Sequence, residues 1–416
     1  MADAGTGAAN GRALAFVLVT VGLNMLGVGL AWPILPKLVQ ALAGGGISDA
    51  AYAYAWIGVL YAGAQFVFAP LLGALSDARG RRPVLIASQG ALAVDYLLMT
   101  LVPDLVWLAI LRLASGAFAA TISTANAYIA DISTPANRAR NFGYVSAAFG
   151  IGFIVGPVLG GLLGEVSLRL PFLVAGLLTL ANVAFGWFAL PETLPTGRRA
   201  SLSLSGINPF ATLGRLGRYP ALSPLIAVKT LQGLAQRGLE ASWVLYTAYR
   251  FGWGVAAASL SLAFVGVCYF AATVLVVGPL VARLGERRTA LLGLVCAGVS
   301  MLAYGFIDTG WQAYPAIALY CFGNAIAEPA LLSLASATVG EREQGAVQGT
   351  MTSVNALTII VGPLLATLLL AAVTAPNAAI DFPGAWFALS AILYAGAFAI
   401  VRTRLGIASD RDNNPT

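Results

Sequence analysis

Long apolar stretches alternate with short polar segments along the whole chain of 416 residues. A helix needs roughly 20 apolar residues to cross a bilayer. Stretches of this kind predict a first set of helices near residues 13–36, 51–75, 83–103, 105–129, 142–164 and 170–190. A second set lies near residues 221–248, 254–282, 289–307, 313–337, 345–371 and 384–401. The pattern therefore predicts an all-α membrane protein with 12 transmembrane helices.

The segment 191–220 interrupts this pattern, because it is rich in Ser, Pro and Gly and carries Arg198, Arg199, Arg215 and Arg218. We interpret it as a cytoplasmic linker between an N-terminal six-helix bundle, residues 1–190, and a C-terminal six-helix bundle, residues 221–404. Residues 405–416 are expected to form a disordered cytoplasmic tail.

The composition agrees with a lipid environment. Hydrophobic residues make up 59% of the chain and charged residues only 10%, with a mean hydropathy of +0.84. Soluble domains carry about 25% charged residues, because their surface faces water. No cleavable signal peptide is expected, because the first apolar stretch is uncharged from Ala13 to Pro36, too long for the apolar region of a signal.

The positions of the Lys and Arg residues predict the topology. With the N-terminus inside, 17 of the 23 fall in cytoplasmic segments. The other residues are Lys37, Arg169 and Arg250 in external segments, and Arg112, Lys229 and Arg237 within helices. Because cytoplasmic loops carry an excess of positive charge, both termini are expected in the cytoplasm.

Several classes of function are disfavoured. A nucleic-acid partner is not expected despite the net charge of +6, because no basic run is interleaved with aromatic residues. The three cysteines lack paired spacing and the chain has no histidine, so neither a disulfide framework nor a metal site is predicted. An enzyme and a cofactor are not expected either, since the chain has no Gly-Lys-Ser/Thr phosphate loop and no catalytic histidine. A non-transporting receptor usually adds a soluble domain, and the tails here are short.

Two motifs recur at nearly the same offset. Gly73-Ala-Leu-Ser-Asp-Ala-Arg-Gly-Arg-Arg recurs 205 residues later as Gly278-Pro-Leu-Val-Ala-Arg-Leu-Gly-Glu-Arg. Val155-Gly156-Pro157-Val158-Leu159 recurs 206 residues later as Val361-Gly362-Pro363-Leu364-Leu365. Parallel repeats of this kind predict two related halves, with a cavity at their interface near mid-membrane.

Five segments, taken in chain order, resemble the major facilitator superfamily, and more closely its tetracycline/proton antiporters, which are drug:H+ antiporters with 12 helices. The segments are Leu23-Asn24-x-x-Gly27-x-Gly29-x-x-x-Pro33-x-Leu35-Pro36, Gly73-x-Leu75-x-Asp77-x-x-Gly80-Arg81-Arg82-Pro83, Ala127-Tyr128-Ile129-Ala130-Asp131-Ile132, Gly152-x-x-x-Gly156-Pro157-x-x-Gly160-Gly161 and Leu190-Pro191-Glu192-Thr193. The resemblance covers nearly the whole chain. It implies the major facilitator fold, with two pseudo-symmetric six-helix bundles, and secondary active transport by alternating access.

The loop after the second helix contains one acid, Asp77, among several arginines and beside a glycine turn. Its carboxylate can accept charge-assisted hydrogen bonds from arginine and from the N–H groups that begin the next helix. We predict a gating motif that holds the two halves closed on the cytoplasmic side, formed by Gly73, Asp77, Gly80, Arg81 and Arg82. The alternative is a topological arginine cluster with a helix cap.

The fifth helix carries a glycine at every fourth position from 152 to 164. This spacing lets two helices approach closely, and Pro157 is expected to add a kink. The resemblance suggests that this packing forms a moving interface between the halves, and the alternative is tight packing alone. The residues of this antiporter motif are Gly152, Gly156, Pro157, Gly160 and Gly161.

Ionisable residues at bilayer depth are functional candidates, because an unpaired charge there is costly. They are Asp95, Arg112, Lys229, Arg237, Glu240 and Glu328. Asp95 lies near the middle of the third helix, where the tetracycline antiporters have an acid, and burial favours the protonated form of a carboxylate. Arg112 opens Arg112-Leu-x-x-Gly116, which resembles the proton-coupling motif of the fourth helix. We predict Asp95 and Arg112 as the proton-coupling pair; mutual pairing of all these charges, without function, is the alternative.

The helix 221–248 carries a polar stripe. At 100° per residue, Lys229, Gln236 and Glu240 fall within about 40° of one another, with Gln232 and Arg237 beside them. The stripe is expected to face the cavity, where two cations and two amides suit an anionic substrate. The predicted substrate-binding residues are Asn24, Gln65, Lys229, Gln232, Gln236, Arg237, Glu240 and Glu328.

The chain departs from the tetracycline pattern at Asn24 and Ala297, where that subfamily has acids, and the subfamily's histidine has no counterpart. The sequence favours proton-coupled export of a small amphipathic, drug-like compound. Anionic compounds are among the candidate substrates. The alternative is an importer or uniporter of an organic anion without proton antiport. The expected location is the bacterial inner (plasma) membrane, and the expected partners are lipid, protons and a small-molecule substrate, with the protein acting as a monomer.

Overall fold

The computed structural model describes residues 2–119, 121–134, 136–199, 223–337 and 344–404. These residues are helical with short connections and include no β-strand, which confirms the predicted all-α class. The helices are α1 (Ala2–Ala43), α2 (Ile47–Arg79), α3 (Arg81–Met99), α4 (Leu105–Ala117), α5 (Thr121–Ile132), α6 (Arg138–Val166), α7 (Leu170–Ala189), η1 (Thr196–Arg198), α9 (Ser223–Phe251), α10 (Val255–Leu275), α11 (Val277–Phe306), η5 (Gly310–Gln312), α12 (Ala313–Ala337), α13 (Gln344–Val373) and α14 (Ala385–Arg404).

The chain divides into two compact units. Unit 1 comprises Met1–Gly44, Ile57–Asn208 and Val255–Ala263, and unit 2 comprises Gly45–Trp56, Pro209–Gly254 and Phe264–Thr416. This division differs from the predicted halves in two places, because the first residues of α2 group with unit 2 and those of α10 group with unit 1. Most of the predicted linker and the whole predicted tail lie outside the described residues.

Nine helices among the described residues are long and apolar enough to cross a membrane: α1, α2, α6, α7, α10, α11, α12, α13 and α14. The helices α3 and α9 are less apolar, because they carry the candidate charged residues, while α4 and α5 have only 13 and 12 residues. The multi-pass architecture is confirmed, and the number of 12 spans stays a prediction.

Two predicted helices are interrupted. The segment 105–129 divides into α4 and α5, because Phe118 leaves the helical conformation with φ −101° and ψ 5°; no Pro or Gly at 118–120 marks this break in the sequence. The segment 254–282 is interrupted at Val276, where α10 ends and α11 begins. Pro279 accounts for this second break, because it has no N–H to bond the carbonyl of Leu275.

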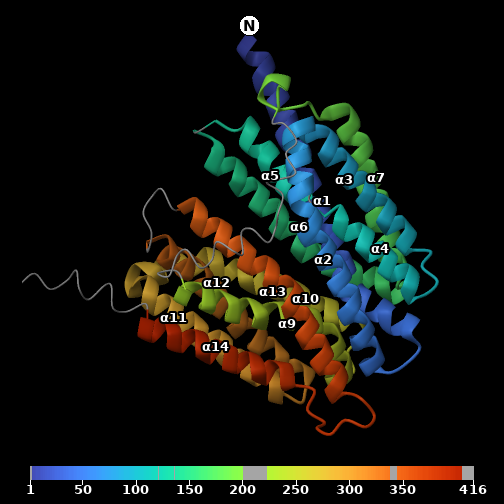
Figure 1. Ribbon diagram of the computed structural model, residues 1–416, viewed down its shortest axis with the longest axis vertical. Helices are drawn as coiled ribbons and strands as arrows, with labels where there is room; N and C mark the ends of the chain where they lie inside the picture. Colours follow the sequence, from blue (N-terminus) through green and yellow to red (C-terminus); the bar gives the residue numbers. More distant parts are fainter. Residues whose placement is uncertain (1, 120, 135, 200–222, 338–343, 405–416) are drawn as a thin grey trace, which may run out of the picture. The chain divides into compact units, whose positions relative to one another are not determined.

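In unit 1, α1 packs along α6 and α7, and α3 packs against α7 (Figure 1). An apolar cluster joins these helices to α5 and consists of Phe16, Val17, Val21, Leu85, Ala125, Tyr128, Ile129, Val145 and Leu190. Leu190 directly follows α7 in the chain. The cluster therefore fixes the segment that leaves α7.

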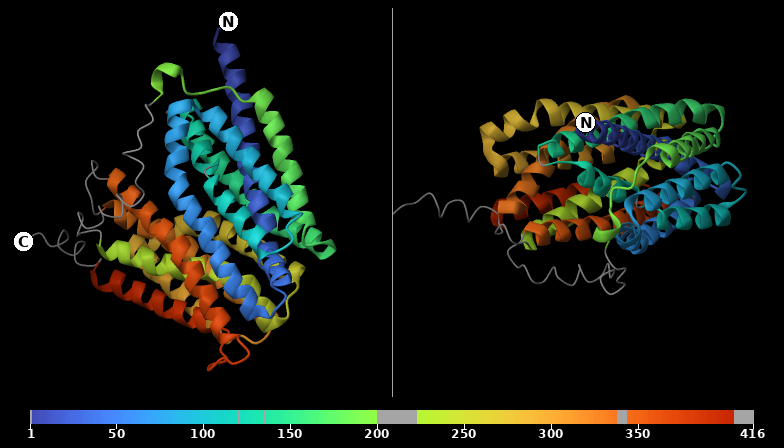
Figure 2. Two further views of the ribbon diagram at one scale, coloured as in Figure 1. Left: turned by 45° about the vertical axis from the view of Figure 1, so that its right-hand side comes forward. Right: turned by 90° about the horizontal axis from the view of Figure 1, so that it is seen from above.

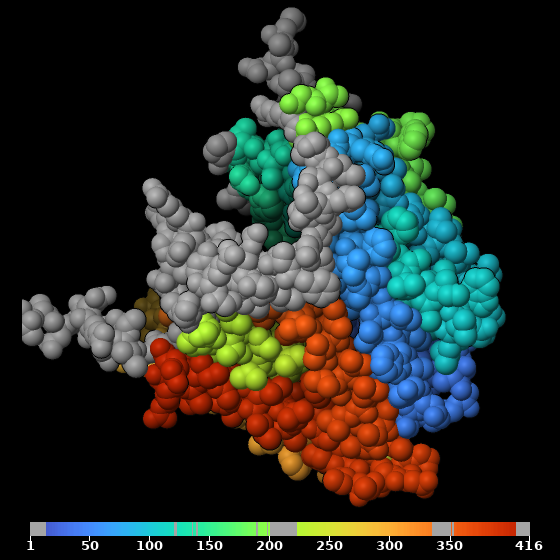
Figure 3. Space-filling view, viewed as in Figure 1, coloured from blue at the N-terminus to red at the C-terminus, as the bar shows by residue number. Residues whose placement is uncertain are grey.

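In unit 2, α9 packs against α13 and α14, and α11 packs against α12 and α14 (Figure 2). The space-filling view shows α13 and α14 as adjoining strips, orange to red (Figure 3). The rings of Trp243, Tyr304 and Phe387 meet edge to face between α9, α11 and α14, with centroids 5.0 to 6.4 Å apart. Where α11 and α12 cross, a Cβ on Gly293 would lie 2.5 Å from the carbonyl oxygen of Gly323. This close crossing leaves no room for a side chain at either glycine.

The internal repeat of the sequence is visible in local geometry. Gly80 and Gly285, 205 residues apart, have φ values of 110° and 74°, in the left-handed region that favours glycine. Arg82 donates to a carbonyl near the end of α7, and Arg287 donates to a carbonyl near the end of α14. Both arginines therefore bind the negative end of the last helix of their half.

Large apolar side chains cover outward surfaces of the helices. Phe188, Val166 and Trp311 are all exposed. Exposed apolar surface is unfavourable in water when it is extensive, so these surfaces fit contact with lipid.

Candidate functional site

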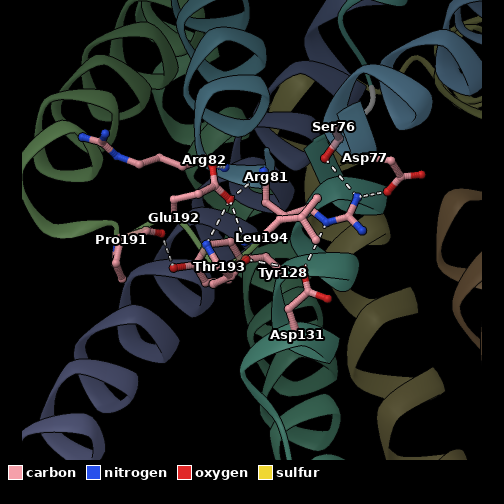
Figure 4. Close-up of polar contacts among 10 residues, drawn as sticks. All are labelled: Ser76, Asp77, Arg81, Arg82, Tyr128, Asp131, Pro191, Glu192, Thr193 and Leu194. Atoms are coloured by element: carbon pink, nitrogen blue, oxygen red, sulfur yellow. Dashed lines mark hydrogen bonds and ion pairs between the residues drawn. The ribbon is translucent and has the colours of Figure 1, made fainter. Parts of the chain in front are cut away.

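Arg81, the first residue of α3, binds acids on two other helices (Figure 4). Its guanidinium forms an ion pair with Asp77 of α2, and its Nε donates to Asp131 Oδ2 of α5 at 3.2 Å. It also donates to the hydroxyl of Ser76 at 3.2 Å. The predicted pairing of Asp77 with an arginine is confirmed, and Asp131 is a second acid partner.

Glu192, rather than Asp77, caps α3. Its carboxylate accepts hydrogen bonds from the backbone N–H of Arg81 at 2.9 Å and of Arg82 at 3.2 Å. It also accepts from the two N–H groups that follow it in the chain, at 2.9 and 3.0 Å. A carboxylate is favoured there, because the first N–H groups of a helix lack partners and carry the positive end of its dipole. The expectation that Asp77 receives these N–H groups is therefore wrong.

Arg82 and Tyr128 complete the link to the end of α7. Arg82 donates to the carbonyl of Trp187 at 2.6 Å, with its guanidinium 5.9 Å from the centre of that ring. Tyr128 donates to the carbonyl of Pro191 at 2.8 Å.

Gly73 of the predicted gating motif makes no close contact: a Cβ on it would meet no described atom within 4 Å. All these residues belong to unit 1, and a latch between the two halves stays a prediction.

Asp95 of α3 and Arg112 of α4 form an ion pair inside unit 1. Arg112 Nη2 donates to Asp95 Oδ2, and the two side chains are only 5% and 8% exposed. The hydroxyls of Tyr61 and Tyr96 lie near enough to interact electrostatically with both groups. Asp95 Oδ1 is buried and has no hydrogen-bond partner among the described residues. The predicted pair is therefore assembled, and the hydroxyl of Ser115 lies close to the same carboxylate.

The predicted stripe of α9 separates into two groups of contacts. Lys229 Nζ binds Glu328 Oε1 of α12 at 2.6 Å, and these side chains are 21% and 46% exposed. Arg237 and Gln236 both bind Glu240 on their own helix, at 2.8 and 3.0 Å. With the Asp95 pair, all the ionisable groups predicted at bilayer depth have partners of opposite charge. The predicted mutual pairing of these charges is therefore present, and the roles of the pairs in transport stay predictions.

Gln232 points away from the stripe into a buried network. Its Nε2 donates to Asn324 Oδ1 at 3.1 Å, and the hydroxyl of Tyr394 donates to the same oxygen at 3.1 Å. Gln232 thus links α9 to α12 in this structure, and its contact with a substrate stays a prediction. In unit 1, Asn24 is buried on α1 and Gln65 is half-buried on α2.

Three glycines of the antiporter motif face α1. A Cβ on Gly152, Gly156 or Gly160 would lie 2.5 to 2.7 Å from backbone atoms of that helix. Pro157 lies inside α6, which continues through it, and a Cβ on Gly29 would lie 2.7 Å from its Cδ. Tight packing accounts for these positions, and movement at this interface stays a prediction.

Another face of α6 meets the beginning of α10. A Cβ on Gly161 would lie 2.6 Å from the Cβ of Ser259, and Glu165 Oε1 accepts from the N–H of Ala256 at 3.0 Å. These residues of α10 group with unit 1. Gly161 therefore serves a different contact from the other glycines of the motif.

Comparison with known proteins establishes the family. A family model of the Major Facilitator Superfamily matches residues 17–363 and residues 230–410. The chain belongs to the Major Facilitator Superfamily. It is 38% identical over 362 residues to the class C tetracycline resistance protein of Escherichia coli, covering 87% of this chain and 90% of that protein. It is 39% identical over 389 residues to the class G protein of Vibrio anguillarum, covering 92% and 96%.

The fold agrees with this assignment. The human organic anion transporter MFSD10 (TETRAN) superimposes with a TM-score of 0.68 at 23% identity, covering 94% of this chain and 99% of that chain. As a member of the Major Facilitator Superfamily related to tetracycline resistance proteins, the protein is a multi-pass membrane transporter and not an enzyme.

One departure from the tetracycline pattern has a packing explanation. Ala297 is fully buried where α11 crosses α12, and a Cβ on Gly323 would lie 2.7 Å from its backbone nitrogen. An aspartate at position 297 would have to separate the two helices or bury a carboxylate between them. The alanine at this position fits the close crossing of α11 and α12.

Sequence reasoning missed the structural roles of Glu192 and Asp131. They contact Arg81 from 111 and 50 residues away in the chain. Both residues lie in segments that resemble the family, so the sequence identified them as candidates. Their contacts with α3 could not be predicted from the motifs. Asn324, which receives Gln232 and Tyr394, carried no signal in the sequence beyond being an amide within an apolar helix.

Proposed function

We propose that this transporter exports a small amphipathic, drug-like compound in exchange for protons, by alternating access, as a monomer in a bacterial inner membrane. The tetracycline resistance proteins that match most of the chain support drug export. The observation that carries proton coupling is the buried ion pair of Asp95 with Arg112.

A proton on Asp95 would remove the charge that balances Arg112. Asp95 Oδ1, which has no donor among the described residues, is the atom that would take the proton. Removing one partner of a buried ion pair typically costs about 3–5 kcal/mol. The protonated state would therefore favour a rearrangement that hydrates Arg112 or pairs it again, and this difference couples a proton to a conformational change.

The substrate site of this proposal uses the part-exposed polar groups of α9 and α12. Its residues are Lys229, Gln236, Arg237, Glu240 and Glu328, and Asn24 and Gln65 remain candidates from unit 1. The alternative function, import or uniport of an organic anion without protons, is supported by the partial exposure of the two cations on α9, 21% for Lys229 and 32% for Arg237.

Proteoliposomes with an imposed pH gradient test the proposal, with labelled tetracycline and a panel of organic anions as probes. We expect accumulation of a probe that collapses when the gradient is dissipated, with a matching proton flux. Asp95→Asn should remove the coupling, while Asp381→Asn, at an exposed acid between α13 and α14, should retain it.

Transport that is unchanged in Asp95→Asn, with no substrate-dependent proton flux in either protein, would sink the antiport proposal. Movement of an organic anion down its own gradient under these conditions would support the alternative instead.

A further inference from the structure

The ion pair between Lys229 and Glu328 differs from the other two pairs. It joins two helices, α9 and α12, whereas Arg237 and Glu240 lie on one helix. It is also accessible, with Glu328 46% exposed, whereas Asp95 is only 5% exposed. Acyl chains are costly surroundings for a carboxylate, so we expect the open side of Glu328 to face water. A solute in that water can reach both charges of the pair.

The pair stands on a rigid base. One turn along α9, Gln232 donates to Asn324, which lies one turn before Glu328 on α12 and also receives the hydroxyl of Tyr394. These three base residues are almost fully buried. Lys229 and Glu328 have long side chains, so the ion pair can open while the buried amide contact holds α9 and α12 together.

Charge balance decides which ligand can open this pair. A monoanion bound to Lys229 would leave Glu328 without a partner, and a monocation bound to Glu328 would leave Lys229 without one. A stranded charge in a low-dielectric site is strongly destabilising. A zwitterion avoids both penalties, because its carboxylate binds Lys229 Nζ and its ammonium binds Glu328 Oε1, replacing one charge-assisted hydrogen bond with two.

The groups around Glu328 agree with an amphipathic ligand. Arg237, Tyr269 and Tyr394 lie near enough to interact with it electrostatically. Arg237 is bound to Glu240, so it does not replace Lys229 as the partner of Glu328 in this structure. Tyr269 on α10 is 39% exposed and offers aromatic surface to the apolar part of a ligand.

We propose that Lys229 and Glu328 form a binding site for zwitterionic amphipathic compounds, which insert a carboxylate and an ammonium group between the two side chains. This inference rests on the proposed function, because it names the substrate class of the same site. It replaces the preference for anions that the cations of α9 suggest when they are considered without their partners.

Isothermal titration of the purified full-length protein near neutral pH tests the inference with three related probes. Ciprofloxacin carries both charges, its methyl ester keeps only the cation, and its N-acetyl derivative keeps only the anion. We expect ciprofloxacin to bind with a Kd about 10-fold or more below that of either derivative. Equal affinity for one of the derivatives, or no binding of ciprofloxacin, overturns the assignment.

Matched double variants locate the preference. Lys229→Met with Glu328→Gln removes both charges and should reduce the preference to less than about 3-fold. Lys229→Glu with Glu328→Lys keeps an ion pair of reversed direction and should retain the preference. Arg250→Met with Asp308→Asn removes an ion pair at the far end of α9, outside the proposed site, and should retain the preference as well. A preference that survives in the uncharged Lys229 and Glu328 variant, or that is lost in the reversed pair while the protein still melts as the wild type does, overturns the assignment.

This test separates the inference from the proposed function, because binding is measured without a proton gradient. A protein that prefers the zwitterion and exchanges no protons retains this site and loses the antiport proposal. A protein that exchanges protons for tetracycline and shows no preference among the probes does the reverse.

Discussion

Gly156 of α6 lies against the backbone of α1, where a methyl group has no space. A Cβ at this position would lie 2.7 Å from the Cα of Gly29 and 2.8 Å from the carbonyl oxygen of Leu26. Contacts between carbon atoms are optimal near about 3.5–4.0 Å, so Gly156→Ala requires the helices to separate by roughly 1 Å. Both contact atoms belong to the backbone, so no change of rotamer can relieve the clash.

The expected loss of stability follows from this geometry. Overpacking a well-packed interface costs about 1–3 kcal/mol. The separation also loosens the contacts of Gly152 and Gly160 with α1, so we expect Gly156→Ala to cost about 2–3 kcal/mol, at the upper end of that range. The double variant Gly152→Ala with Gly156→Ala should cost little more, because one separation of the helices accommodates both methyl groups.

Thermal unfolding followed by tryptophan fluorescence measures this effect in the purified protein. Gly150→Ala is the matched control on α6, because a Cβ there would meet no described atom within 4 Å. It should be neutral or stabilise by up to about 1 kcal/mol, since alanine favours helix over glycine. The packing argument fails if Gly156→Ala unfolds at the same temperature as Gly150→Ala, or if the costs of the two alanines in the double variant simply add.

Three further predictions concern the charged groups. Glu192→Ala should lower the free energy of unfolding by about 1–2 kcal/mol through loss of the α3 cap. Hydrogen exchange should become faster in the first turn of α3 but not in α9. Equal exchange in the variant and the wild type contradicts the capping role. Arg112→Met should be destabilised by about 3–5 kcal/mol, because it strands the Asp95 carboxylate. Adding Asp95→Asn should restore most of this stability, and a double variant that melts no higher than Arg112→Met contradicts the pairing. Exchange of one proton for one zwitterion moves net positive charge inward. An interior-negative membrane potential, set with potassium and valinomycin, should therefore speed export. A transport rate that does not depend on the potential would refute a one-for-one exchange.

Much of the fold could be predicted because lipid makes the hydrophobic pattern nearly decisive. The two halves were visible from the repeat, and the structure gives Gly80 and Gly285 the same left-handed turn. Local breaks were harder: Pro279 explains the interruption at Val276 through a missing N–H, whereas the one glycine near the end of α4, Gly116, lies in a close helix contact and resembles the packing glycines inside other helices. Breaks of this second kind depend on packing between helices, which a single segment does not contain.

The candidate site could be predicted in its residue types but not in its pairing. Asp95 and Arg112 lie 17 residues apart on consecutive segments, so their meeting followed from topology. Lys229 and Glu328 lie 99 residues apart, and α9 alone suggested free cations for an anionic substrate. Glu328 on α12 changes this expectation, because its carboxylate already binds Lys229. An anionic substrate would have to displace that carboxylate.

The exposure of the ion pairs gives them different capacities within the proposed transport cycle. The pair of Asp95 with Arg112 is buried, and its carboxylate oxygen Oδ1, without a hydrogen-bond partner among the described residues, is the atom that takes the proton in the proposed cycle. The pair of Lys229 with Glu328 is open, yet both its charges must stay balanced when a ligand enters. A proton changes the net charge of the first pair, whereas a zwitterion leaves the net charge of the second unchanged. Under the proposed function, protonation of Asp95 therefore changes the charge balance that favours one conformation over another. The pair of Lys229 with Glu328 selects the substrate, because only a ligand with both charges gives each side chain a partner.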